Sequence, residues 1–510
     1  MRVYHLLYFL LQSAFALDIL MYVNVIGSSH LQYAIKLIEI LNRHGHSVDV
    51  ICGMLNSQST LKGSNGARKL IVVNFSEESP WGAAPQLNNP FSERSDWNRL
   101  WMDSTFRNFM EVNEQLCDLL LASSEIADLL SSTRYDVALI NGYDFCLFAL
   151  AHNYKILPVV SYVPSPAYYT QTYHAGLPEL PLYENCTVMN STIRELYGDE
   201  LYELVLGNRI VGSNVRSHRI QNEKLRVRFG DDFPDVREIA MNISLDFSNS
   251  HPLLEEPRPI SHRLRYIGGI GIPTPKPLSD ELDGMLDLSD KGTVIFSFGT
   301  HIRHDQIPDE LVEVFIKSFQ RFPEYNFFWK FHGNAKIRAK NIFNFDWLPQ
   351  TDLLYDCRVV AFISHLGLNS LTEAASAGVP VVAIPLFSDQ VHNARRAMAL
   401  GIGEIVKKSE ITEENFSRAL EKVLLDEGYR RRAKELSSMM IALPDKPERI
   451  FLEGIEYAAK FKHLSSHYRL AGANHNFLVQ IGWDVAAFFT SSHLLSVYFT
   501  VKVAFCVLRI

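Results

Sequence analysis

Apolar and polar residues alternate along the N-terminal part of the chain in a pattern typical of a parallel sheet. The apolar run at residues 18–26 predicts a strand, and Gly27-Ser28-Ser29 predicts a turn after it. From about His30 to Arg43, apolar residues recur at helical spacing, and Gly45 ends the predicted helix. Residues 47–51 predict a second strand, so the segment is a strand–helix–strand unit.

The same pattern continues and then restarts after a proline-rich stretch. We expect the following elements: strands at residues 135–140, 157–161, 293–300, 326–331, 359–364 and 381–384, and a helix at residues 369–377. Because 510 residues exceed what one core usually supports, we predict an α/β fold of two doubly wound, Rossmann-like domains that face each other across a cleft. The expected divisions are an N-terminal domain at 17–270, a linker at 271–291, a C-terminal domain at 292–445 and a helical return with a juxtamembrane segment at 446–484.

Both ends of the chain resemble targeting signals. Residues 1–16 combine a basic start, an apolar run and Ala14-Phe15-Ala16, which predicts a secretory signal peptide. The apolar segment at 485–508 is long enough to cross a bilayer, and we expect a single transmembrane helix there rather than a buried core helix. The bulk of the chain is then lumenal, which is compatible with sequons at Asn74, Asn185, Asn190, Asn242 and Asn415.

Charge and cysteine content narrow the partners. The formal net charge is −8 with no basic stripe, which argues against nucleic acid. The six cysteines show neither metal-ligand spacing nor a disulfide framework, so we expect stability to come from the cores. No Asp-x-Asp pair occurs, and we therefore expect no divalent metal.

Residues after the strand at 359–363 predict a phosphate site, because ligands bind beyond the carboxyl ends of strands in such sheets. Gly367 lets backbone approach a ligand closely, and Asn369 or Ser370 is expected to cap the following helix. A pyrophosphate would meet free N–H groups and the positive end of the helix dipole there, with His365 at the mouth of the site. Glu373, one helical turn after Asn369, is placed to accept hydrogen bonds from ribose hydroxyls.

Two further positions suggest sugar chemistry. Asp389-Gln390 follows the next predicted strand, and a carboxylate beside a carboxamide suits the hydroxyls of a hexose. In the first domain the turn at 27–30 lacks the G-x-G-x-x-G pattern, which excludes a dinucleotide fingerprint and argues against a nicotinamide oxidoreductase. That turn instead places His30 at a helix N-terminus, facing the cleft.

The long pattern at residues 365–394 resembles the signature of the UDP-glycosyltransferases, the family of animal UDP-glucuronosyltransferases and plant UDP-sugar transferases. It reads His365-x-Gly367-x-Asn369-Ser370-x-x-Glu373, then Gly378-Val379-Pro380, Pro385-Leu386-Phe387-x-Asp389-Gln390 and Asn393-Ala394. Upstream, Trp347-x-x-Gln350 resembles the family's uracil site, Ser297–Thr300 its diphosphate loop, and Arg258-Pro259 with Tyr266–Gly269 its interdomain segment. The match covers essentially the whole chain.

The resemblance implies a GT-B fold, a UDP-sugar donor without a further cofactor, and a small lipophilic acceptor with a hydroxyl group. It also implies a place in the endoplasmic reticulum membrane and is compatible with a homo-oligomer. The family's general base corresponds to His30, and Ser297, Thr300, His365, Asn369 and Ser370 would stabilise the leaving diphosphate in an inverting transfer of glucose or glucuronic acid. The aromatic segment from Tyr162 to Tyr173 is expected to line part of the acceptor pocket.

Two departures from the family pattern bear on activity. Leu366 stands where relatives carry Gly or Cys, and we expect it to narrow the loop. Asn141 stands about where the family's Asp orients the base, while Asp144 lies three residues further on, and the sequence leaves open which of them orients His30. These departures define one alternative, a catalytically impaired relative that binds UDP-sugar or lipophilic ligands. A structural membrane glycoprotein would not require Trp347, Gln350, Asp389 and Gln390 at their places.

Overall fold

The computed structural model describes residues 16–25, 27–54, 66–75, 90–91, 99–166, 217–257, 260–300, 302, 306–331, 339–470 and 483–508. Several predicted features lie outside these residues. They are the signal peptide apart from Ala16, the sequons at Asn185 and Asn190, Arg258-Pro259, and residues 167–173 of the aromatic segment.

A seven-stranded sheet forms the first half of the molecule, with all neighbouring strands parallel in the order β3-β2-β1-β4-β5-β6-β7. Its strands are β1 (Asp18–Val25), β2 (Ser47–Met54), β3 (Lys69–Asn74), β4 (Val137–Asn141), β5 (Val159–Val163), β6 (Leu245–Ser248) and β7 (Leu264–Tyr266). The strands predicted at 135–140 and 157–161 are present but begin and end slightly later.

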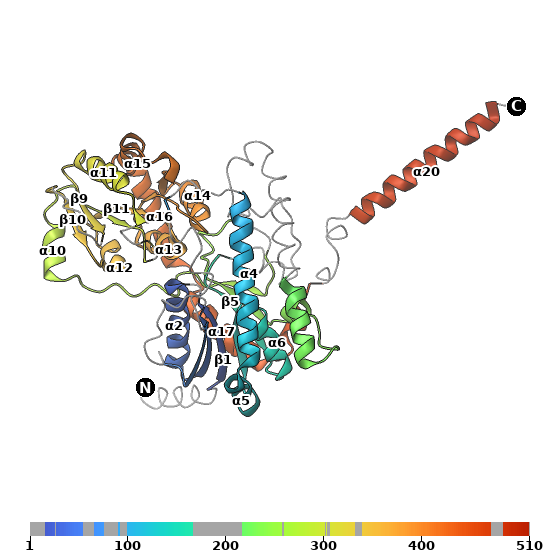
Figure 1. Ribbon diagram of the computed structural model, residues 1–510. Helices are drawn as coiled ribbons and strands as arrows, with labels where there is room; N and C mark the ends of the chain where they lie inside the picture. Colours follow the sequence, from blue (N-terminus) through green and yellow to red (C-terminus); the bar gives the residue numbers. More distant parts are fainter. Residues whose placement is uncertain are drawn as a thin grey trace, which may run out of the picture.

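Helices cover both faces of this sheet, as a doubly wound fold requires (Figure 1). The helices include α2 (Ser28–Arg43), α4 (Arg99–Ala122), α5 (Ser124–Ser132), α6 (Cys146–Asn153) and α9 (Val236–Ala240). On one face, Leu37 and Leu41 of α2 pack against Met21 of β1. On the other face, the core combines Leu20 and Tyr22 of β1 with residues of α4, α5, α6 and α9.

The second half contains a six-stranded parallel sheet in the order β10-β9-β8-β11-β12-β13. The strands are β8 (Thr293–Ser297), β9 (Asn326–Lys330), β10 (Ile342–Phe345), β11 (Val359–Ser364), β12 (Val381–Ala383) and β13 (Gly403–Ile405). The helices are α10 (Asp280–Leu286), α11 (Asp309–Gln320), α12 (Gln350–Leu354), α13 (Leu368–Ala377), α14 (Gln390–Ala399), α15 (Glu413–Leu425) and α16 (Glu427–Ala442), with a short 3-10 turn at Lys408–Glu410. The molecule therefore has two parallel-sheet α/β halves, as predicted.

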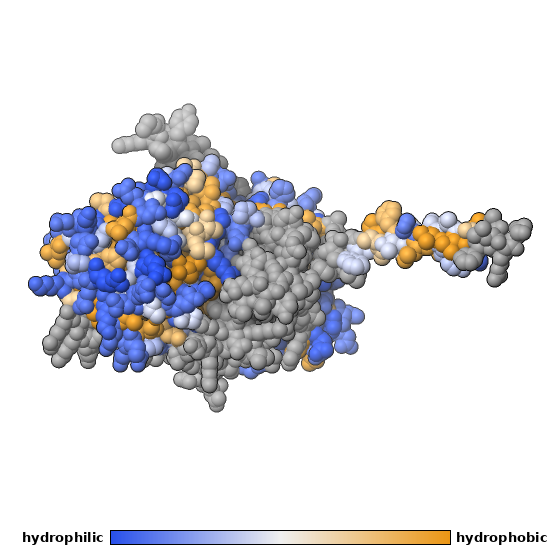
Figure 2. Space-filling view, turned by 90° about the horizontal axis from the view of Figure 1, so that it is seen from above, coloured by the Kyte–Doolittle hydropathy of each residue, from blue (hydrophilic) through white to orange (hydrophobic). Residues whose placement is uncertain are grey.

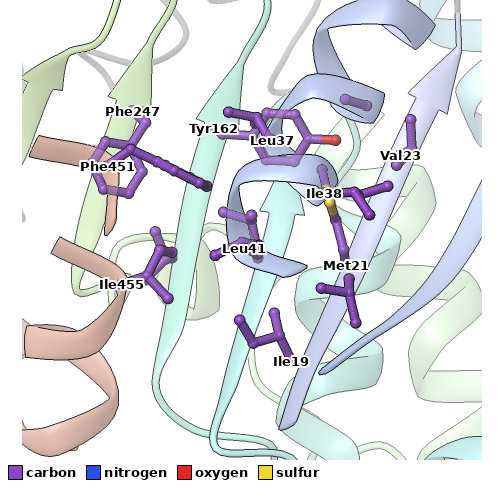
Figure 3. Close-up of a cluster of buried hydrophobic side chains, with 14 of the residues drawn as sticks. Ile19, Met21, Val23, Leu37, Ile38, Leu41, Tyr162, Phe247, Phe451 and Ile455 are labelled. Atoms are coloured by element: carbon purple, nitrogen blue, oxygen red, sulfur yellow. The ribbon is translucent and has the colours of Figure 1, made fainter. Parts of the chain in front are cut away.

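After the second sheet the chain returns to the first. Helices α17 (Pro447–Lys460) and α18 (Leu464–Tyr468) follow α16. Phe451 of α17 packs against Phe247 of β6 with ring centroids 5.3 Å apart, and Ile455 joins the same core (Figure 3). Helix α17 therefore packs against the first half of the molecule, although it follows the second sheet in the chain.

The last described helix, α20 (Trp483–Leu508), projects from the body (Figure 1). Hydrophobic residues are visible along it in Figure 2. Within the part of the chain that the structure describes, no helix combines the length and apolar character needed to cross a membrane. The transmembrane helix predicted at 485–508 is therefore not confirmed.

The expectation that the cysteines form no disulfide framework needs correction. Cys117 of α4 and Cys146 at the start of α6 form a disulfide, with Cα atoms 5.5 Å apart. The spacing of 29 residues between these cysteines does not predict their pairing, because the pairing depends on two helices that pack on the same face of the sheet. The disulfide joins α4 to the segment that follows β4.

Candidate active site

The carboxyl ends of the second sheet bring most of the predicted donor residues to one edge. Ser297 ends β8, Ser364 ends β11, and β12 leads through residues 384–389 to α14. Because β11 lies between β8 and β12, the loops that follow these three strands are neighbours. The predicted phosphate and sugar positions therefore share one site.

His365 is held between two glycines of different loops. A Cβ added to Gly299 would lie 2.7 Å from Cε1 of His365, and one added to Gly367 would lie 3.0 Å from its Nε2. Gly299 also has φ +77°, which side chains rarely adopt. Gly299 therefore leaves the room that the imidazole occupies, and a side chain at Gly367 would press against the same ring.

The helix that begins at this site is capped differently from the prediction. Gly367 is the N-cap residue of α13, so neither Asn369 nor Ser370 has the predicted capping role. The N–H of Leu368 donates to Oδ2 of Asp389 at 3.3 Å. Asn369 is exposed, and its Oδ1 accepts from Nδ2 of Asn249 in the first half at 3.4 Å. Asn369 thus lies where the two halves meet.

Leu366 does not narrow the loop as expected. Its side chain is fully buried in the apolar cluster that includes Leu371 and Ala394. Its φ of +58° is in the left-handed region, where a non-glycine residue is strained. The backbone carbonyl accepts from Nδ2 of Asn393 at 3.1 Å, which helps to hold this conformation. The Leu side chain therefore packs into the core rather than into the loop.

Glu373 and Gln350, which the sequence pattern assigned to the ribose and the base, contact each other. The Nε2 of Gln350 donates to Oε2 of Glu373, and the hydroxyl of Thr351 donates to Oε1 at 2.9 Å. Burial raises the pKa of Glu373, and the hydrogen bonds from Thr351 and Gln350 oppose that rise. The carboxylate is thus a fixed acceptor at the side of the site.

Trp347 presents a largely free aromatic face. Its side chain is 68% exposed, and Nζ of Lys330 lies 4.8 Å from the ring centroid. The same ammonium donates to the carbonyl of Gly299 at 3.0 Å, and burial lowers the pKa of Lys330. Lys330 therefore joins the predicted base-stacking residue to the predicted diphosphate loop, at whose end Thr300 is exposed.

Asp389 and Gln390 have different environments. Burial raises the pKa of Asp389, opposed first by the hydrogen bond from Nδ2 of Asn393, which measures 2.9 Å. Gln390 is buried, and its Oε1 accepts from the N–H groups of Leu386 and Phe387 at 2.8 and 3.0 Å. The carboxamide oxygen of Gln390 thus shapes the loop, whereas Asp389 is partly exposed beside Ser388.

His30 lies in the first turn of α2, as predicted, and α2 begins after Gly27 at the end of β1. Its imidazole stacks on the ring of Tyr143, with centroids 5.8 Å apart and planes inclined by 27°. Burial raises the pKa of Tyr143; a hydrogen bond with Ser165 opposes this, and the Asp389 carboxylate adds to it. Tyr143 therefore stacks on the histidine of the first half, and its pKa is sensitive to the carboxylate of the second.

Asn141 and Asp144 lie on opposite faces of the first sheet. Along β4, Val137 and Leu139 face the core that contains α2, so Asn141 faces the same way. Asp144 is fully buried towards the other face, where Oδ2 accepts from the Tyr22 hydroxyl at 2.8 Å and Oδ1 from the N–H of Cys146 at 2.9 Å. Burial raises the pKa of Asp144 to about 6. Asn141 shares its face of the sheet with α2 and His30, and Asp144 does not.

Three residues near the site were not predicted from the sequence: Tyr143, Lys330 and Thr351. Lys330 is the last residue of β9 and the penultimate residue of the strand predicted at 326–331, so its place near the carboxyl edge was a usable signal. Tyr143 lies between Asn141 and Asp144, and only the three-dimensional turn after β4 shows that it, rather than Asp144, contacts His30.

The chain resembles known proteins both in its sequence and in its fold. The profile of the family described as UDP-glucuronosyl and UDP-glucosyl transferase matches residues 20–510. UDP-glucosyltransferase 2 of Dactylopius coccus is 25% identical over 485 residues, covering 92% of this chain and 89% of the relative. UDP-glucuronosyltransferase 1A7 of Mus musculus is 26% identical over 484 residues, covering 91% and 87%. Among solved structures, Medicago truncatula UGT71G1 complexed with UDP-glucose aligns with a TM-score of 0.58 at 15% identity, over 87% of this chain and 98% of that one, which shows a shared fold.

Proposed function

The chain belongs to the UDP-glucuronosyl and UDP-glucosyl transferase family, and from this premise we propose that it transfers glucose or glucuronic acid to a hydroxyl of a small lipophilic acceptor with inversion at the sugar. One observation carries the proposal. Asn249, directly after β6 of the first sheet, donates to Asn369 of the donor edge at 3.4 Å, so the carboxyl edges of the two sheets meet there. His30 follows β1 at the same edge of the first sheet, so the candidate base and the donor residues border the same space.

The reaction needs one proton transfer and one displacement. His30 takes the proton of the acceptor hydroxyl, and the oxygen forms a bond to C1 of the sugar as the bond from C1 to the UDP oxygen breaks. The electron pair of that bond leaves with UDP. Donors fixed around the diphosphate then stabilise the charge that develops, and His365 and the loops at Gly299 and Gly367 surround that position.

The donor-side residues divide into three roles. Trp347 stacks on uracil, while Gln350 and Glu373 hold the base and the ribose hydroxyls. Ser297, Thr300, Asn369 and Ser370 line the expected diphosphate position at the ends of β8 and β11. Asp389 accepts hydrogen bonds from sugar hydroxyls, with Gln390 fixing the loop that carries it.

Replacement of His30 tests the central role. His30→Ala should lower kcat by roughly 10²- to 10⁴-fold, the usual contribution of general base catalysis, while UDP binds as before. Turnover with a phenolic acceptor and a panel of UDP-sugars measures the first effect, and calorimetry with UDP measures the second. Retained turnover would remove His30 from the base role. Addition of a chelator should leave the rate unchanged.

We also propose that the chain works in the lumen of the endoplasmic reticulum. The apolar leader at residues 3–11 supports entry into the secretory route, and the Cys117–Cys146 disulfide suits an oxidising compartment. Asn74 and Asn242 are exposed sequons available for glycosylation. A mobility shift on endoglycosidase digestion would support lumenal residence, and alkaline carbonate extraction tests membrane attachment through residues 485–508. An undigested, cytosolic chain would contradict the proposal.

A further inference from the structure

Two described residues of the first half, Pro90 and Phe91, contact the second half. Pro90 and Phe91 lie between β3 and α4, both of which belong to the first half. Phe91 nevertheless packs against the core of the second sheet, and its ring meets that of Phe298 edge-on with centroids 5.4 Å apart. The carbonyl of Pro90 accepts a hydrogen bond from Nζ of Lys408 at 3.2 Å.

Lys408 is a buried cation that the donor-site roles above do not use. Its residue is only 8% exposed, at the start of the 3-10 turn after β13. Besides Pro90, Nζ donates to the carbonyl of Leu386 at 3.1 Å. A buried ammonium is costly unless polar atoms surround it, so removing this side chain would release both carbonyls from a shared partner.

Both contacts of the 90–91 segment end at loops of the donor site. Leu386 lies in the loop that Gln390 holds and that carries Asp389. Phe298 lies between Ser297 and Gly299, in the loop that packs against His365. One point on the first half thus touches the expected sugar loop through Lys408 and the expected diphosphate loop through Phe91.

From this geometry we infer that Lys408 is a positioning residue for donor binding. By bonding Pro90 and Leu386 at once, it couples docking of the 90–91 segment to the conformation of the loop that carries Asp389. The inference rests on the proposed function, because it assigns the sugar of a UDP-sugar to that loop. It predicts that Lys408 affects the sugar part of the donor more than the UDP part.

The test measures equilibrium binding rather than turnover. In a His30→Ala background, calorimetry compares UDP with whichever of UDP-glucose and UDP-glucuronate the parent protein binds more tightly. Lys408→Met should weaken UDP-sugar binding about tenfold and UDP binding no more than about threefold, as expected for a lost charged hydrogen bond near the sugar alone. Lys407→Met is the matched control, because Lys407 is exposed and contacts only Glu410 among the ion pairs of the described chain, at 3.1 Å.

A second variant keeps the test decisive if Lys408→Met folds poorly. Phe91→Ala removes the other contact of the same segment, and it should weaken UDP-sugar binding about fivefold in the parent but less than about twofold once Lys408 is Met, since coupled contacts are not additive. If Lys408→Met does not fold, Phe91→Ala alone must weaken UDP-sugar binding more than UDP binding. Additive effects, or equal losses for both ligands, would overturn the positioning role alone. Failure of the His30→Ala parent to bind either ligand would overturn the donor-binding function and the positioning role together.

Discussion

The ring of Tyr143 stacks on the imidazole of His30, with centroids 5.8 Å apart and an angle of 27° between the planes. Relatives are expected to orient this base with an aspartate, and here Asn141 stands at that position on the same face of the sheet as α2. Stacking restricts the orientation of the imidazole without adding a charge. The chain therefore combines an aromatic support for its candidate base with a neutral amide on the same face of the sheet, whose Oδ1 accepts from the N–H of Tyr143 at 3.1 Å.

Removal of the aromatic support should reduce catalysis selectively. Tyr143→Leu is expected to lower kcat about tenfold, because a misplaced catalytic group loses much of its advantage, while the Kd for UDP stays unchanged. Tyr143→Phe keeps the ring and should retain most of the rate. Steady-state kinetics and UDP calorimetry on both variants check this. Equal losses in the two variants would assign the effect to the hydroxyl instead.

A carboxylate at position 141 should strengthen the base. Asn141→Asp is expected to raise kcat about tenfold, because a carboxylate stabilises the imidazolium that forms in the transition state. The same charge favours protonated His30, so the acid limb of the pH–rate profile should move to higher pH. Rates between pH 5.5 and 9 measure both effects. An unchanged profile would show that residue 141 does not interact with His30.

Asp144 should affect stability rather than activity. Its pKa of about 6 in the folded chain exceeds the ordinary value of 3.8, so the folded state holds a proton that the unfolded state has lost. The contribution of Asp144 to the free energy of unfolding is therefore fully present below about pH 4. Up to about 3 kcal/mol of it is lost as the pH rises towards 6. Asp144→Asn should therefore gain stability relative to the parent between pH 4 and 7.

Thermal unfolding of the Asp144→Asn variant across this pH range gives the measurement. Its activity should fall less than about threefold, since the carboxylate bonds Tyr22 and Cys146 on the face away from α2. A loss comparable with that of His30→Ala would instead give Asp144 a catalytic role.

Trp347 and Lys330 should contribute to UDP affinity to different extents. Loss of base stacking in Trp347→Ala is expected to weaken UDP binding about 10- to 100-fold. Lys330→Met keeps the indole but removes the cation from its ring and from the Gly299 carbonyl, so a weaker effect of about three- to tenfold is expected. Calorimetry with UDP checks both values. A larger effect from Lys330 would indicate direct contact with the diphosphate.

The disulfide should stabilise the segment that carries Tyr143. A paired Cys117→Ser, Cys146→Ser variant is expected to lose about 3–4 kcal/mol of stability, from the chain entropy of a loop of this size. Cys357→Ser, which alters an exposed free cysteine, is the control and should leave the unfolding temperature unchanged. Chemical denaturation measures the difference, and an equal effect in the control would contradict it.

Local patterns in the sequence were sufficient for much of this description. Spacing of apolar residues located α2 and the strands on either side of it, and most strands of the second sheet, because a half-buried helix and a buried strand each impose their own period. The order of strand ends then placed His365, Glu373 and Asp389 at one edge. The helix cap at Gly367 was missed, since its geometry depends on the neighbouring loop rather than on local capping chemistry.

The sequence by itself determined the two α/β halves, the edge at which the donor residues gather and the position of His30 at the start of a helix. Tertiary structure decided which neighbours these residues have. Asn141 and Asp144 are three residues apart, yet the turn after β4 sends them to opposite faces of the sheet. Lys408 bonds Pro90 across 318 positions, and Cys117 pairs with Cys146 because α4 and α6 share a face. Such contacts depend on how whole elements pack, and no local period or propensity records that.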